Sequence, residues 1–374
     1  MPEPRDLVVE ALTRPATHFE RWSARDWTHF FQQARNAGLL GRAGARLLGL
    51  WPSGRVAPWP ANLEGHFAAA TRLMEAQRAE VQRELGYITR ALAGLGAPVV
   101  VLKGAAYLAA GLPPGASRVF SDVDILVPKA AIQEAESRLM LQGWVGTHDN
   151  AYDQRYYREW MHELPPMQHL HRGTTLDLHH NILPSTARFK PDGRHLVERA
   201  EPLPGWPGLH VLAPTDMVLH CMTHLFMNEE TSHSLRDLSD LDLLLRHFGS
   251  NGAFWPLLVE RATLLDLRRP MHYAIRHVVQ VLDTPVPADV AARIGAYAPA
   301  APMGVLMDAI WRRALRCPHP SAALTGTSAA RFALYVRGHW LRMPPGMLAR
   351  HLTIKALRLH GRTTGEPVTT PTQG

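Results

Sequence analysis

The sequence contains little cysteine, and no part of it has the length and apolarity of a membrane segment. Its two cysteines, Cys221 and Cys317, are isolated and stand in no metal-ligand spacing, which argues against a disulfide framework and a zinc ribbon. No run of about 18 uncharged apolar residues occurs. The start, MPEPRDLVVE, has charges where a signal peptide needs an apolar core. We therefore expect a cytoplasmic protein without a transmembrane segment.

The composition is that of an ordinary globular protein with a mild positive charge. With 374 residues, the chain exceeds the usual size of a single core, so we expect two or three domains, or one core with large helical additions. Hydrophobic residues make up 46% and charged residues 20%, which is typical of soluble domains. The net charge of +7 suits an anionic ligand such as a nucleotide without requiring a polynucleotide.

Periodicity and turn residues divide the chain into four regions. Helical spacing predicts an N-terminal helical region over 1–95, with one long helix at 63–95. A central region, 96–213, contains short apolar runs that predict strands, and a C-terminal helical domain follows at 214–362. The polar residues 363–374 are expected to be a disordered tail. Strands are expected at 99–102 and 120–127 and in a hairpin at 164–182 that turns at Arg172-Gly173; the Pro-rich residues 201–214 are expected to form a link; later helices are expected at 215–228, 232–248, 255–267, 269–283, 300–316 and about 328–359.

Three aspartates in the central region have the placement of metal ligands. Asp122 and Asp124 are two residues apart at the head of an apolar run, so on a strand both side chains leave the same face. Asp177 has a similar setting between Leu176 and Leu178. Three strand-borne carboxylates are a suitable ligand set for two-metal phosphoryl or nucleotidyl transfer, with Mg²⁺ as the expected ion and Mn²⁺ as the alternative. Asp177 would hold the ion that activates the acceptor, and would be able to take its proton.

Nearby residues suit the phosphates of a nucleoside triphosphate such as ATP. Lys103 and Arg118 are the expected cationic partners of the triphosphate, and Ser121 offers a hydrogen bond. Gly104 follows a predicted strand and opens a predicted helix, so its N–H can approach a phosphate closely. His179 shares the strand face of Asp177 and is expected in the same cleft, where an ordinary polar strand position is the alternative.

The Ser-Asp-x-Asp pattern occurs a second time, at Ser239–Asp242, and there it serves as an internal control. The surrounding leucines have helical spacing. Residues two apart on a helix diverge by about 200°, so Asp240 and Asp242 cannot chelate one ion together. Asp237 and Asp240 are expected either on a solvated, salt-bridged helix face or at the border of the nucleotide pocket.

The stretch VLKGAAYLAAGLPPGASRVFSDVDILV, followed by LDLHHNI, resembles the nucleotidyltransferase superfamily with a polymerase-β-like core. It is most similar to an uncharacterised bacterial branch with a Lys-Gly element, Arg-x-x-Ser-Asp-x-Asp and a later Asp-Leu-His. The resemblance covers residues 98–182 and implies an α+β fold, in which a small mixed sheet over 96–213 forms the nucleotidyltransferase core between the two helical regions. It also implies a biosynthetic acceptor. The superfamily usually has Gly-Ser where this chain has Gly104-Ala105, so Lys103 is expected to replace the serine as a point charge.

These observations predict an enzyme that moves a nucleoside monophosphate from an NTP to a small-molecule, sugar or peptide acceptor. Two alternatives remain open. An RNA or DNA terminal nucleotidyltransferase is supported only by the basic character of the chain from residue 311 onward, without the interleaved aromatics of RNA-stacking surfaces. A non-catalytic nucleotide-binding protein on the same fold is supported by the missing Gly-Ser hydroxyl.

Overall fold

The central sheet, which carries the predicted metal ligands, is mixed. The computed structural model describes residues 4–51, 57–147, 151–344 and 346–349. Within this part of the chain, seven strands pair in the order β3-β4-β5-β2-β1-β7-β6. β2 runs parallel to β5 and β1 runs parallel to β7, whereas the other neighbours are antiparallel. The strands are β1 (Val99–Val101), β2 (Asp122–Leu126), β3 (Trp144–Gly146), β4 (Met167–His169), β5 (Thr175–His179), β6 (Glu201–Pro202) and β7 (Leu209–Val211).

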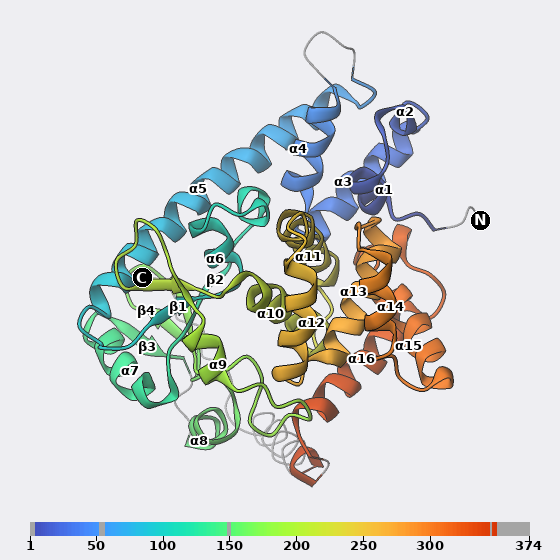
Figure 1. Cartoon of the computed structure of the whole chain (residues 1–374). Helices are drawn as coiled ribbons and strands as arrows, with labels where there is room; N and C mark the ends of the chain where they lie inside the picture. Colours follow the sequence, from blue (N-terminus) through green and yellow to red (C-terminus); the bar gives the residue numbers. More distant parts are fainter. Residues whose placement is uncertain (1–3, 52–56, 148–150, 345, 350–374) are drawn as a thin grey trace, which may run out of the picture.

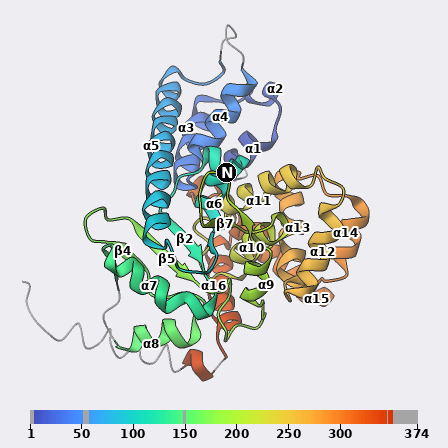
Figure 2. The same ribbon diagram turned by 60° about the vertical axis from the view of Figure 1, so that its left-hand side comes forward.

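Helices before the sheet form a layer of their own, and one long helix connects this layer to the sheet (Figures 1 and 2). Near its start, that helix packs Leu63 and Phe67 into an N-terminal hydrophobic cluster. Near its end, it packs Leu85 and Ile88 into the cluster beneath the sheet. It therefore links two cores. These helices are α1 (Leu7–Thr13), α2 (Ala16–Phe19), α3 (Ala24–Asn36), α4 (Leu40–Leu50) and the long α5 (Ala61–Ala91).

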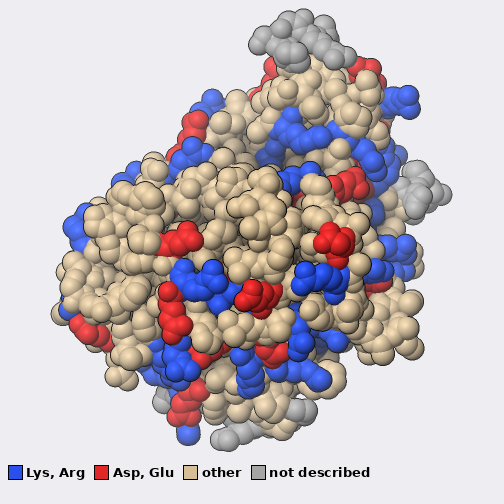
Figure 3. All heavy atoms as spheres, in the orientation of Figure 1, with Lys and Arg blue, Asp and Glu red and all other residues tan. Residues whose placement is uncertain are grey.

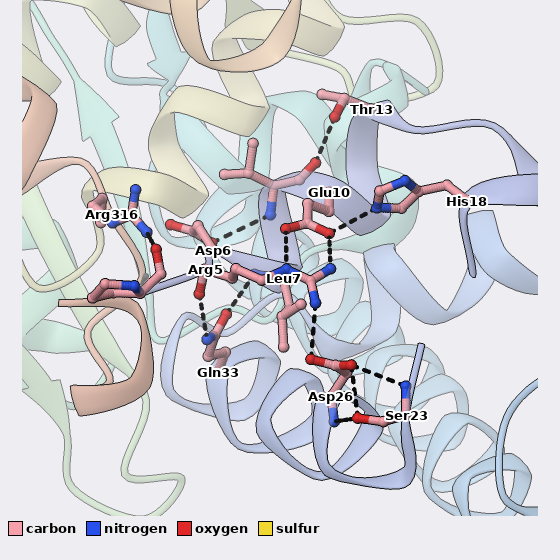
Figure 4. A network of polar contacts seen from close by, with 12 residues as sticks. Arg5, Asp6, Leu7, Glu10, Thr13, His18, Ser23, Asp26, Gln33 and Arg316 are labelled. Atoms are coloured by element: carbon pink, nitrogen blue, oxygen red, sulfur yellow. Dashed lines mark hydrogen bonds and ion pairs between the residues drawn. The ribbon is translucent and has the colours of Figure 1, made fainter. Parts of the chain in front are cut away.

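Polar contacts tie the N-terminal segment to its neighbours (Figure 4). Arg5 donates to Glu10 Oε1 over 3.0 Å and to Asp26 Oδ1 over 2.9 Å, which connects α1 to the start of α3. The Gln33 side chain accepts from the Leu7 N–H at 2.8 Å and donates to the Arg5 carbonyl at 3.0 Å. A cation from the far end of the chain, Arg316, donates to the Pro4 carbonyl at 2.7 Å. The first helices are therefore fixed against C-terminal structure.

C-terminal helices share a hydrophobic core with the sheet. α10 (Pro214–Met227) lies in the middle of them and is buried on nearly all sides, as its apolar sequence VLHCMTHLFM requires. One continuous cluster of buried residues extends from the end of α5 through the sheet to Leu334. The domain boundaries predicted at 95 and 213 stay predictions, and residues on both sides of 213 belong to this cluster. The other helices are α6 (Lys103–Ala109), α7 (Ile132–Leu141), α8 (Ala151–Trp160), α9 (Gly193–Glu198), α11 (Ser234–Phe248), α12 (Phe254–Leu264), α13 (Arg268–Leu282), α14 (Ala288–Gly295), α15 (Ala301–Ala314) and α16 (Thr327–Arg342), with short 3-10 turns at η1 (Pro113–Ser117), η2 (Lys129–Ala131) and η3 (Pro320–Ala322).

Most expected elements are confirmed, and one expectation is wrong. The strands near 99 and 122 and the hairpin turning at Arg172-Gly173 are present, and a mixed sheet is flanked by helices on both sides in sequence. The residues expected to form a link, 201–214, contain β6 and β7, and β7 pairs in parallel with β1. Residues 201–214 contain four prolines and two glycines, and this composition is typical of a loop, so the two short strands could not be recognised from the sequence. The predicted tail, 363–374, lies outside the described residues.

Among the described residues, no helix combines the length and apolarity needed to cross a bilayer.

Candidate active site

Two neighbouring strands bring the predicted carboxylates onto one face of the sheet. β2 and β5 are parallel, and in their register Asp124 lies opposite Asp177. Paired residues on adjacent strands project to the same side, and Asp122 shares that side because it lies two residues before Asp124. Val123 and Leu176, which are neighbours of these aspartates in sequence and pair with each other, are buried on the other face. Because the apolar side chains of each strand are buried on one face of the sheet, the aspartates project from the opposite face.

Asp124 is the most enclosed of the three aspartates, with 3% of its surface exposed. Its Oδ1 accepts from Lys103 Nζ at 2.6 Å and lies 3.0 Å from His179 Nε2. Potential ligand atoms of Asp124, Asp177 and His179 all lie within 4.8 Å of one another. Asp122 accepts from the Ser121 hydroxyl at 2.9 Å. The structure thus brings Lys103, Asp124, Asp177 and His179 together, while Ser121 contacts Asp122.

The two facing carboxylates have opposite electrostatic environments. Burial raises the pKa of Asp124, but the charge of Lys103 and the hydrogen bond from His179 outweigh it and hold that pKa well below its usual range. Burial and then the charge of Asp124 raise the pKa of Asp177 to about 7. Burial lowers the pKa of His179, yet the charges of Glu163 and Asp124 more than compensate, so this pKa is raised. Asp177 is therefore a carboxyl group without a cationic counterpart of its own.

The donor set fits a divalent cation that prefers oxygen. Asp177 Oδ1 is buried and has no hydrogen-bond partner among the described residues. A buried acceptor without a partner is costly, and a cation bound between the facing carboxylates would satisfy it. Carboxylate oxygens are the ligands that Mg²⁺ and Mn²⁺ favour. Asp124 and Asp177 contribute two carboxylates to a group of three candidate ligands with His179, whereas Asp122 is not part of that group and its role as a ligand stays a prediction.

A cavity of about 500 Å³ opens beside these carboxylates. Lys103, Asp122 and Asp177 line it from the sheet side, and residues of the C-terminal helices close the opposite side. The far wall includes Asn228, Glu229, Glu230, His339 and Arg342. A smaller cavity of about 150 Å³ lies between α5 and the sheet, and both Ser121 and Asp122 border it. Asp122 therefore stands at the border of both spaces.

The Lys-Gly element has an unusual backbone and tight packing. Lys103 adopts a left-handed φ of 48°, a conformation that costs a non-glycine residue energy and is often found at functional sites. Gly104 is buried, and a Cβ there would lie 2.9 Å from Arg118 Nε and 3.1 Å from the Phe120 ring. Any larger residue at this position would therefore force the Arg118 side chain to move.

Arg118 belongs to a buried ion network with aspartates of α11. Its guanidinium pairs with Asp240 and lies 3.8 Å from Asp237. Asp240 also accepts from Arg42 Nη2 at 2.6 Å, and burial, followed by the charge of Arg118, lowers the pKa of Arg42 to about 9. The expectation of a solvated helix face at Asp237 and Asp240 is wrong, since both aspartates are buried. The second Ser-Asp-x-Asp copy lies on α11, as its leucine spacing predicted.

Sequence reasoning missed two residues next to the carboxylates. Glu163 Oε2 lies 3.3 Å from His179 Nδ1, and His162 Nε2 lies 3.8 Å from the same oxygen. Both residues precede Pro165-Pro166, which limited the predicted strand to later residues. A bridge between Glu163 and His179 places this segment against the end of β5. The only sequence signal was the pair His162-Glu163 itself, just before the hairpin.

The mixed sheet carries facing carboxylates with a lysine and a cavity beside them, and the chemistry of these groups is compatible with a metal ion and an anionic substrate. A family model described as uncharacterised nucleotidyltransferase matches residues 23–283. That match covers more than half of the chain, and the chain therefore belongs to this nucleotidyltransferase family, which indicates transferase activity on a nucleoside triphosphate. The matched range includes α3–α13 and every strand of the sheet. Searches of curated proteins and of solved structures gave no match.

Proposed function

We propose that this protein transfers a nucleoside monophosphate from an NTP to a small-molecule, sugar or peptide acceptor, on a polymerase-β-like core. The observation that carries the proposal is the register of β2 and β5, which sets Asp124 opposite Asp177 beside a cavity of about 500 Å³. An acceptor oxygen attacks the α-phosphorus, the bond to the bridging oxygen breaks, and pyrophosphate leaves.

Each residue near the carboxylates has a separate part in this proposal. Asp122, Asp124 and Asp177 hold Mg²⁺, with Mn²⁺ as the alternative, and the bound ion would neutralise phosphate charge and orient the reacting oxygens. Lys103 lines the cavity next to Asp124 and supplies positive charge for the β- and γ-phosphates. Ser121 holds the Asp122 carboxylate through its hydroxyl.

The remaining predicted positions have weaker support. Arg118 is engaged with Asp240, so we propose that it acts by holding the loop before β2 rather than by touching phosphate. Gly104 leaves room for the Arg118 side chain to pass over it, and the role of Gly104 in phosphate binding stays a prediction. His179 holds Asp124 by its Nε2 atom and orients that carboxylate.

The cavity supports a compact acceptor. Its volume lies within the range of typical small-molecule pockets, which is about 300–1,000 Å³. Its walls combine acidic and basic side chains. On the face shown in Figure 3, basic and acidic side chains lie among one another. A polynucleotide track would instead need a continuous run of positive charge.

Product identity tests the proposal. Purified protein is incubated with each NTP and Mg²⁺, and the amounts of pyrophosphate and NDP formed are both measured. Because no other acceptor is added, water is the acceptor in this assay. Pyrophosphate that depends on Mg²⁺ is expected from the wild type, with a loss of at least about 100-fold in Asp124→Asn. NDP without pyrophosphate would overturn nucleotidyl transfer.

The second Ser-Asp-x-Asp copy supplies a matched control. Asp242 is a half-buried aspartate on α11 that pairs with Arg246 at 2.7 Å, and it does not line the cavity beside the facing carboxylates. Asp242→Asn makes the same chemical change as Asp124→Asn and should leave pyrophosphate release within about twofold of wild type. Equal losses in both variants would show that the effect of Asp124→Asn is on folding, and would contradict the assignment.

A further inference from the structure

A second group of candidate ligands lies next to the facing carboxylates and has a different chemistry. His162 and Glu163 follow α8, and Glu163 forms an antiparallel bridge with His179 at the end of β5. Backbone hydrogen bonds hold this segment in place, from His180 N to the His162 carbonyl at 2.8 Å and from Leu164 N to the Leu178 carbonyl at 2.9 Å. Bridge partners project to the same face, which explains why the Glu163 and His179 side chains meet.

The distances between these side chains suit a small tetrahedral ion. Glu163 Oε2 lies 3.3 Å from His179 Nδ1 and 3.8 Å from His162 Nε2. One ligand atom from each of the three residues lies within 4.8 Å of the other two. Bonds of about 2.0–2.1 Å in a tetrahedral zinc site separate neighbouring ligand atoms by about 3.3–3.4 Å, so only small side-chain shifts are required.

An unpartnered nitrogen of His179 is a suitable ligand for a cation. Asp124 as a carboxylate only accepts hydrogen bonds, so His179 Nε2 must donate to it, which leaves the lone pair on Nδ1 in the neutral ring. His179 is 2% exposed, and its Nδ1 has no hydrogen-bond partner among the described residues. It faces the carboxylate oxygen of Glu163, which is a second acceptor. In the neutral ring these two acceptors repel each other, and either a proton on Nδ1 or a metal cation between the two atoms removes that repulsion.

The bond from His179 to Asp124 is also what a metal-binding histidine needs. Histidine ligands usually donate their other N–H to a carboxylate, which fixes the ring and increases the basicity of the binding nitrogen. Here Asp124 has that position, behind the ring of His179. Two imidazoles and one carboxylate form a donor set suited to a borderline transition metal, whereas Mg²⁺ prefers oxygen alone.

We propose that His162, Glu163 and His179 bind a Zn²⁺ ion, separate from the ion held by Asp122, Asp124 and Asp177. Three protein ligands leave one coordination position open, as in catalytic zinc sites. His162 and Glu163 both line the cavity of about 500 Å³, so the open position is available to an oxygen of the acceptor. The zinc binding stands on its own, whereas this part in acceptor binding rests on the proposed function.

Zinc affinity measured by competition with a chromophoric chelator tests the site. The full-length protein is first stripped with EDTA and then titrated with Zn²⁺ in excess Mg²⁺, which saturates the oxygen-rich site with its preferred ion. Wild type is expected to bind one equivalent. His162→Ala and Glu163→Gln should each weaken Zn²⁺ by at least about 100-fold, because losing a ligand costs no less than losing the group behind a ligand.

Two control variants locate the ion. His180→Ala removes a neighbouring histidine that lies next in sequence to His179, and Asp177→Asn removes a ligand of the oxygen-rich site; both should change Zn²⁺ affinity by less than about 10-fold. Glu163→Gln preserves shape, and an unchanged melting temperature in EDTA shows that it folds. Unchanged affinity in His162→Ala and Glu163→Gln would overturn the proposal. So would an equal or larger loss in Asp177→Asn, which would place zinc among the aspartates.

A second readout separates this proposal from the proposed function. Cobalt substituted for zinc should give visible absorption bands in the wild type that are lost in His162→Ala, and bands of equal intensity in both proteins would contradict the ligand set. Neither measurement uses nucleotide turnover. Failure of zinc binding therefore leaves pyrophosphate release untouched, and absence of pyrophosphate leaves the zinc result intact.

Discussion

Asp240→Asn should be among the most destabilising single substitutions in the chain. Asp240 is fully buried and is the common partner of Arg42 and Arg118. Arg42 is itself buried, and its other partners are the hydroxyls of Ser117 and Ser239 and a backbone carbonyl. Asparagine retains the shape of the side chain but not its charge. The substitution therefore leaves two guanidinium groups close together without the carboxylate that separates them.

The expected cost follows from the burial of the pair. Removing one partner from a buried ion pair costs about 3–5 kcal/mol, because the remaining charge loses its compensation. For a chain of this length, with an unfolding entropy of about 2.1 cal/mol/K per residue, this lowers the melting temperature by roughly 4–6 °C. Chemical denaturation followed by tryptophan fluorescence gives the free energy of unfolding directly.

An exposed ion pair provides the control for the same chemical change. Arg155 and Glu159 lie one turn apart on α8, with side chains 66% and 48% exposed. Glu159→Gln should cost no more than about 0.5 kcal/mol. Adding Arg42→Met to Asp240→Asn removes the more deeply buried guanidinium and should recover at least half of the loss. If Asp240→Asn costs no more than Glu159→Gln, the buried network does not hold α4, η1 and α11 together.

Three further outcomes are expected. In EDTA, Asp124→Asn should lower the melting temperature because Lys103 and His179 lose their carboxylate, whereas Asp177→Asn should raise it because Asp177 has no cation of its own; shifts of the same sign would contradict the described pairing. Burial lowers the pKa of His277 to about 4, so the folded state resists protonation and stability falls as the pH drops below 6.5, by about 2 kcal/mol between pH 6.5 and 5. Urea titrations at both pH values should show a loss smaller by that amount in His277→Gln, and an equal loss would refute the assignment. Lys103→Met should weaken NTP about 10- to 100-fold and NMP much less, as measured by titration with Mg²⁺, and equal effects on both would remove Lys103 from the phosphates.

The strands of the site could be predicted because their signal is local. The parity of Asp122 and Asp124 and the apolar neighbours of Asp177 are properties of a few adjacent residues, and the structure has all three on β2 and β5. The turn between β4 and β5 was also visible, since Gly173 supplies the left-handed φ of 69° that such a turn requires. Side-chain direction on a strand needs no knowledge of the rest of the chain.

What the sequence could not reveal depends on distant partners. Asp240 has the appearance of a solvated helix residue until Arg42, 198 positions earlier, is placed against it. β7 is too short and too close to prolines to be recognised alone, and it exists because β1 offers an edge for parallel pairing. Glu163 lies next to the site only because its segment forms a β-bridge with His179. Each of these cases is a contact between segments that are distant in sequence, and local sequence patterns do not predict such contacts.

In the proposed function, an ion held by Asp122, Asp124 and Asp177 acts on the α-phosphate of an NTP. Replacing one non-bridging α-oxygen by sulfur tests this directly, because Mg²⁺ binds sulfur poorly and Mn²⁺ binds it better. For one of the two diastereomers, pyrophosphate release should fall at least about 10-fold in Mg²⁺ and recover in Mn²⁺, while the unmodified NTP shows no such preference. A sulfur effect of equal size in Mg²⁺ and Mn²⁺ for both diastereomers would show that no metal ion contacts the α-phosphate.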